Sequence, residues 1–114
     1  MRKWMMVILL SIFTLPAFCT EQTFNNAPIL DVMCSKDRKV AANPDAHTKE
    51  CALECKGAGF GIVTSDHKFL KFDSAGNERV LAQLKNSKKQ DHLRVDVSGD
   101  VQGDTLKVKS IKLL

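Results

Sequence analysis

The clearest alternation of apolar and polar residues lies near the C-terminus. Apolar side chains occupy every second position in residues 92–98 (HLRVDVS) and again in residues 105–110 (TLKVKS). This period is typical of strands with one buried face, and the turn-forming residues 99–104 separate the two segments. The sequence therefore predicts a terminal β-hairpin. Because the apolar positions change parity at Ile111, we expect a bulge or the end of pairing near Ser110.

Three shorter apolar segments predict further strands. Residues 29–34 (ILDVMC) form the first, and residues 59–64 (GFGIVT) and 68–72 (KFLKF) flank a polar turn, which is the pattern of a second hairpin. Within this hairpin, Phe69 and Phe72 differ in parity. We therefore expect their side chains on opposite faces of the strand.

Two helices are expected between the strands. Asn43 and Pro44 fit an N-cap followed by the first helical residue, and Gly57 is a typical residue just past a helix end. These signals predict a helix over residues 44–56. Asn77 is expected to cap a second, shorter helix.

The predicted element order is β-α-β-β-α-β-β, which makes the protein mainly β with two short helices. Five short strands with a helix between the third and fourth predict a small five-stranded barrel of the OB-like kind, with an open α+β sheet as the alternative. We expect this domain to occupy residues 29–114. The polar residues 20–28 (TEQTFNNAP) are expected to be a flexible leader.

The N-terminus has the pattern of a secretory signal peptide over residues 1–19. Arg2 and Lys3 precede an apolar run that is too short for a typical membrane span. We expect cleavage after Cys19, export to the periplasm or the medium, and no membrane span in the mature chain. The alternative is a lipoprotein that keeps Cys19 as its acylated first residue.

Charge and composition exclude several classes of function. Without Arg2 and Lys3, 15 basic residues face 13 acidic ones, so the net charge of the rest of the chain is about +2. A nearly neutral chain with interspersed charges does not predict nucleic-acid binding. No arrangement of acid, base and nucleophile is recognisable, so we expect a protein that is not an enzyme.

Four residues carry the candidate chemistry: Cys34, His47, Cys51 and Cys55. In the predicted helix the last three recur every fourth residue and share one face, which can meet Cys34. In an oxidising compartment a disulfide is the first expectation. Residues four apart on a helix are too distant for an unstrained bridge, so we favour Cys34 with Cys55, leaving Cys51 as a free thiol; Cys34 with Cys51 is the other candidate.

A metal site is the alternative for the same residues. Three cysteines and a histidine are a ligand set that suits zinc. On an unbroken helix, however, the Cα atoms of His47 and Cys55 would be about 12 Å apart, which favours three ligands including Cys34.

The chain resembles a group of small, uncharacterised, exported bacterial proteins. The resemblance rests on Cys34, the CALEC motif of residues 51–55 followed by Gly57, the hairpin FGIVTSDHKFLKF, and the terminal VDVSGDV and GDTLKVKSI segments. It implies an OB-like fold and brings no established activity.

Two hypotheses on function follow. The first is an exported binding or structural module, without a cofactor, that is stapled by a disulfide and recognises an unknown protein or small-molecule ligand through one face of the barrel. The second is a protein that binds zinc or copper, or performs thiol redox chemistry, with Cys34, Cys51 and Cys55.

Overall fold

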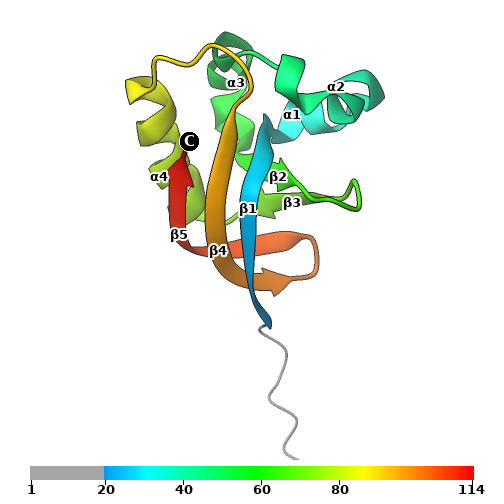
Figure 1. Ribbon diagram of the computed structural model, residues 1–114, viewed down its shortest axis with the longest axis vertical. Coiled ribbons are helices and arrows are strands. Elements are labelled where there is room, and N and C mark those ends of the chain that lie inside the picture. Colours follow the sequence, from blue (N-terminus) through cyan, green and yellow to red (C-terminus); the bar gives the residue numbers. More distant parts are fainter. Residues whose placement is uncertain (1–19) are drawn as a thin grey trace, which may run out of the picture.

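The computed structural model describes residues 20–114 (Figure 1). The predicted signal peptide and Cys19 lie outside the described residues. The strands of the described part are β1 (Thr20–Asp31), β2 (Phe60–Val63), β3 (Phe69–Phe72), β4 (Arg94–Gln102) and β5 (Thr105–Leu113). Its helices are α1 (Val32–Ser35), α2 (Arg38–Ala42), α3 (Lys49–Glu54), α4 (Ser74–Asn86) and the 3-10 turns η1 (Pro44–Ala46) and η2 (Lys56–Ala58).

The five strands close into a barrel in the order β1-β2-β3-β5-β4. Strands β3 and β5 run parallel, and the other neighbouring pairs are antiparallel. The predicted mainly β, OB-like barrel with five strands is thereby confirmed, and the open sheet is not formed. The long β1–β2 connection, which contains α1, α2 and α3, covers one end of the barrel (Figure 1).

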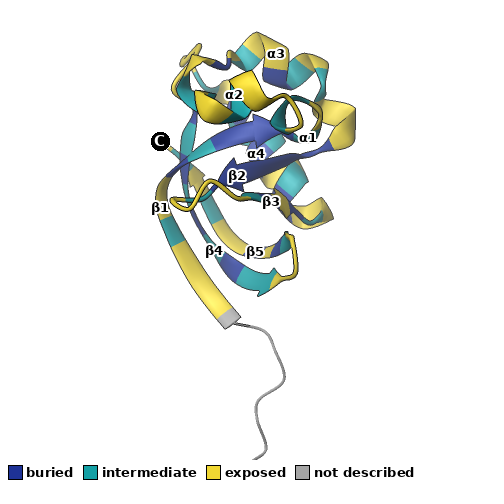
Figure 2. Ribbon diagram, turned by 90° about the vertical axis from the view of Figure 1, so that its right-hand side faces the viewer, coloured by how far each residue is buried: buried dark blue, intermediate teal, exposed yellow. Residues whose placement is uncertain are grey.

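Strand β1 is much longer than predicted at its N-terminal end. The expected flexible leader is instead a strand, since Thr20–Pro28 pair with β4 and only the last three residues of β1 pair with β2. An irregularity between Phe24 and Ala27, with Asn26 at a φ of 54°, interrupts the pairing with β4 and bends the strand before pairing resumes at Ala27. Most of the N-terminal part of β1 is exposed (Figure 2). Its residues are therefore mostly polar, and they lack the apolar pattern that would have predicted a strand.

The terminal hairpin forms as predicted and is longer. The register shifts so that Ser98 faces Ser110 while Gly99 faces Val108, which confirms a bulge at the predicted place. Pairing then continues to Leu113, and only Gly103 and Asp104 remain as the turn.

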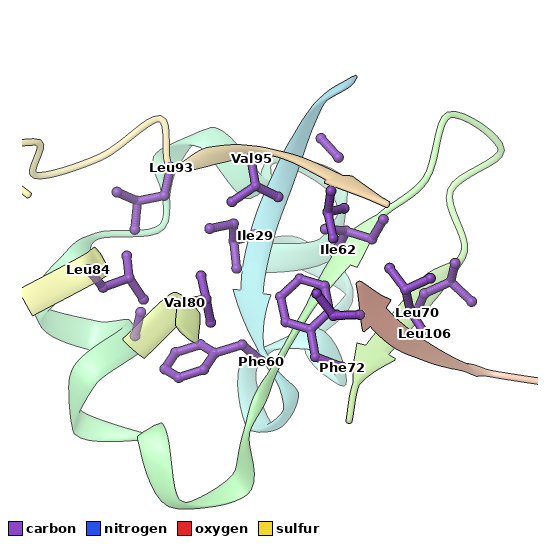
Figure 3. Close-up of a cluster of buried hydrophobic side chains, with 14 residues drawn as sticks. Ile29, Phe60, Ile62, Leu70, Phe72, Val80, Leu84, Leu93, Val95 and Leu106 are labelled. Atoms are coloured by element: carbon purple, nitrogen blue, oxygen red, sulfur yellow. The ribbon is translucent and has the colours of Figure 1, made fainter. Parts of the chain in front are cut away.

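The core fills the barrel and the space beneath α4 (Figure 3). Val80 and Leu84 of α4 are fully buried against side chains from the strands. Phe72 is buried and Phe69 is only partly so, as their parity predicts. The predicted cap of α4 was wrong by one turn: Asp73 caps the helix by accepting from the Gly76 N–H, whereas Asn77 accepts from the Phe60 N–H at 2.8 Å.

The β1–β2 connection differs most from expectation. The first strand ends at Asp31, so Cys34 lies on α1 and not on a strand. The predicted helix over residues 44–56 is wrong, because His47 has an extended backbone that separates η1 from α3. Thr48 caps α3, while the Asn43 side chain makes no cap hydrogen bond.

Candidate metal and thiol site

A buried pair of polar side chains lies at the covered end of the barrel. Asp31, the last residue of β1, is fully buried, and His47 is 8% exposed. The His47 Nε2 atom lies 2.7 Å from Asp31 Oδ1. The second carboxylate oxygen accepts a hydrogen bond from the Cys34 N–H at 2.9 Å and so caps α1. The carboxylate of Asp31 therefore organises both the histidine and the first cysteine.

Cys34 completes a group of three potential metal ligands. One ligand atom each from Asp31, Cys34 and His47 lies within 4.8 Å of the others. Burial raises the pKa of the Cys34 thiol to about 12, helped by a hydrogen bond to Asp31, by the charge of that carboxylate and by the neighbouring Cys55. At neutral pH, without a bound ion, this thiol is protonated.

Cys55 lies beside Cys34. The nearby Cys55 is among the smaller causes of the raised pKa of the Cys34 thiol. The backbone explains the proximity: Asp31 pairs with Phe60, and the Val32 N–H donates to the Gly59 carbonyl at 2.9 Å. The start of α1 and the segment before β2 are thereby held at the same barrel end.

The segment that carries His47 is anchored to the start of β4. Arg94 makes a two-pronged contact with Asp45, with Nε–Oδ1 at 2.9 Å and Nη2–Oδ2 at 2.7 Å. The guanidinium holds the pKa of the Asp45 carboxyl below its usual range. Backbone hydrogen bonds from His92 to Asp45 and from Lys49 to Gln90 add to this anchor.

Cys51 does not belong to the group of three potential ligands. It is exposed on α3, outside the group of Asp31, Cys34 and His47, and the three described cysteines are all free thiols. It lines a pocket of about 230 Å³ together with Val40 and His47. The predicted helical face shared by His47, Cys51 and Cys55 is not formed, because α3 begins only at Lys49.

Asp31 was missed by the sequence analysis. Its position inside an apolar run (ILDVMC) is the signal that could have revealed it, since a carboxylate in a buried strand needs a partner. His47, in contrast, was singled out and lies in the group, although its partner is an acid and not a helical neighbour.

The thiol of Cys34 is poorly suited to nucleophilic catalysis. A reactive cysteine has a lowered pKa and a thiolate at neutral pH, whereas burial and the nearby carboxylate keep Cys34 protonated. A bound cation reverses this balance, because a coordinating thiol loses its proton to the metal. The chemistry of the donor set, one oxygen, one sulfur and one nitrogen, fits zinc.

A larger cavity than the one beside Cys51 lies elsewhere on the barrel. It has a volume of about 450 Å³ and is lined by the bent part of β1, the α2–η1 segment, the β2–β3 turn and Arg94. Its lining is a mixture of small polar and apolar side chains, including Asn25, Pro44 and Ser65.

Comparison with family models, curated proteins and solved structures finds no match for this chain. Among the described residues, no helix is long and apolar enough to cross a membrane. The site must therefore be interpreted from its own geometry.

Proposed function

We propose that this chain is an exported, non-enzymatic metal-binding module. Asp31, Cys34 and His47 hold one zinc ion, and the neighbouring Cys55 supplies the fourth ligand. The observation that carries the proposal is the convergence of an acid, a thiol and an imidazole within 4.8 Å at a largely buried position.

The Asp31–His47 pair requires little movement to accept the ion. The proton between His47 and Asp31 is replaced by zinc, and two bonds of about 2.0 Å at a tetrahedral angle need about 3.3 Å between the ligand atoms. The observed separation of Nε2 and Oδ1 is 2.7 Å. This pair therefore needs to open by less than about 1 Å. Ion binding also removes the proton from Cys34, so that its thiolate balances the charge.

Zinc titration of the reduced, chelator-stripped protein tests the proposal. We expect one equivalent to bind, and cobalt substitution to give a sulfur-to-metal charge-transfer band with the visible spectrum of a tetrahedral ion. Cys34→Ser and His47→Gln should weaken binding by about tenfold or more. Cys51→Ser is the matched control, because its thiol is exposed and lies outside the group.

Two results would overturn the proposal. One is the absence of stoichiometric zinc binding by the folded wild-type protein. The other is loss of binding in Cys51→Ser with retention in Cys34→Ser. A parallel titration with copper(I) shows which of the two ions the site prefers. The intact mass of protein from its own exported fraction tests both export and cleavage before Thr20.

A second candidate function is ligand recognition through the barrel face. It is favoured by the 450 Å³ cavity beside the bent part of β1. Small-molecule ligands that bind there should shift the NMR signals of Asn25 and Ser65 and leave those of Cys51 unchanged. A ligand screen that never perturbs the cavity residues would contradict this function.

A further inference from the structure

Cys34 belongs to two chemical groupings at once. With Asp31 and His47 it forms the candidate metal site, and its thiol also lies close enough to Cys55 for that cysteine to affect its pKa. The two cysteines come from segments that the barrel holds together through the Val32 to Gly59 backbone hydrogen bond. A Cys34 sulfur atom that forms a disulfide with Cys55 can no longer bind a metal ion as a thiolate, so the two uses exclude each other.

We propose that a reversible Cys34–Cys55 disulfide controls metal occupancy: the dithiol form binds zinc and the disulfide form releases it. This inference rests on the proposed function and adds its regulation. The sequence predicted either a disulfide or a metal site for these cysteines. In this proposal the two are the oxidised and the reduced state of one site.

The exchange is balanced with a disulfide as oxidant. One cysteine of the pair attacks the external disulfide, forms a mixed disulfide and releases one thiol. The other cysteine then displaces the second thiol and closes the Cys34–Cys55 bond. Two electrons pass from the protein to the external disulfide, two protons are taken up by the released thiols, and the zinc ion leaves. A dithiol reductant reverses these steps.

The alternative bridge is disfavoured by local geometry. Cys51 and Cys55 lie one helical turn apart, at the start and the C-cap of α3. Their Cβ atoms are then about 5–6 Å apart, whereas a disulfide needs roughly 3.5–4.5 Å. Cys51 is also exposed, while Cys34 and Cys55 are both partly buried.

The remaining ligands tolerate release of the ion. Asp31 and His47 already bind each other at 2.7 Å, and no buried side-chain nitrogen or oxygen atom of the described residues lacks a hydrogen-bond partner. When the zinc ion and the Cys34 thiolate are withdrawn, Asp31 and His47 hydrogen bond to each other again. Neither side chain is then left as an unpaired buried charge. The metal-free form is thus a stable alternative state.

The test compares zinc affinity in defined redox states. Wild type and Cys51→Ser are prepared as dithiols and, by treatment with oxidised glutathione, as disulfides whose bridge is located by peptide mapping. We expect both proteins to form the Cys34–Cys55 bridge and to lose zinc affinity by about tenfold or more. Oxidised glutathione should speed zinc release from wild type and Cys51→Ser by about tenfold or more over the rate of each protein without oxidant. It should speed release from Cys55→Ser much less, because no intramolecular step can follow.

The outcomes separate the two proposals. If the reduced wild type does not bind zinc, the proposed function fails and the inference with it. If the reduced form binds zinc and the mapped Cys34–Cys55 disulfide form binds it equally well, only the redox control fails. A bridge that maps to Cys51 also overturns the redox control.

Discussion

Asp31 and His47 are sixteen positions apart in the chain, yet their side chains meet at 2.7 Å in a buried site at one end of the barrel. The pair links the last residue of β1 to the segment between η1 and α3. Because Asp31 also caps α1, its carboxylate joins the end of β1 to two parts of the β1–β2 connection, α1 and the segment that carries His47. The candidate site is therefore built around an acid rather than around the cysteines alone.

The three described cysteines should differ sharply in reactivity. In the reduced, metal-free protein at pH 8, we expect iodoacetamide to modify the exposed Cys51 first and Cys34 at least about tenfold more slowly, because only the thiolate reacts and burial raises the pKa of Cys34 to about 12. Mass spectrometry of a time course measures the three rates. Concentrated denaturant should make them equal, and rapid alkylation of Cys34 in the folded protein would contradict the described environment.

The contact between Asp45 and Arg94 should make stability depend on pH. Asp45→Asn in the metal-free protein is expected to lower the free energy of unfolding by about 1 kcal/mol at pH 6. Because the folded pKa of Asp45 is lowered by Arg94, this stabilisation is present above the unfolded pKa of about 3.9 and is lost as the pH falls through the folded pKa.

Denaturant unfolding at pH 6 and pH 3 measures the effect. The difference between wild type and Asp45→Asn should shrink at the lower pH. Arg94→Lys is the control that keeps the charge and loses the two-pronged geometry, so it should retain only part of the stabilisation. An equal difference at both pH values would argue against the ion pair.

Thr48 and Asn43 offer a matched test of where the helix begins. Thr48→Ala removes the hydroxyl that accepts from the Cys51 N–H at 3.2 Å, and should destabilise the fold by about 1 kcal/mol. Asn43→Ala should change the stability by no more than about 0.5 kcal/mol, since the Asn43 side chain caps neither adjacent helix. Thermal unfolding of the two variants decides the matter: the reverse ranking would support a helix that starts at Pro44.

Gly61 and Gly57 differ in the space around them. A Cβ atom at Gly61 would lie 2.8 Å from Lys71 Cα and nearer still to the Leu70 carbonyl oxygen, both on the paired strand. Gly61→Ala should therefore cost about 2 kcal/mol or more, because the β2–β3 ladder must separate. Gly57→Ala meets nothing within 4 Å and should change stability by about 0.5 kcal/mol at most. Equal denaturation midpoints for the two variants would contradict this packing.

The amino-acid sequence by itself determined the features that depend on neighbouring residues. Two apolar segments around a polar turn predicted β2 and β3, alternation predicted the terminal hairpin, and the change of parity at Ile111 predicted the bulge near Ser110. These signals are local, because the side chains of a half-buried strand alternate between core and solvent along the chain itself. They were sufficient to predict the element types that lead to a small barrel.

Only the tertiary structure decided the rest, because it depends on residues far apart in sequence. The polar residues 20–28 become a strand through backbone pairing with β4, which leaves little trace in their composition. The predicted helix over residues 44–56 is interrupted because His47 turns inward to meet Asp31. The same folding leaves Cys51 outside the ligand group and brings Cys34 beside Cys55. Local periodicity identified the candidate side chains, and non-local burial selected which of them meet.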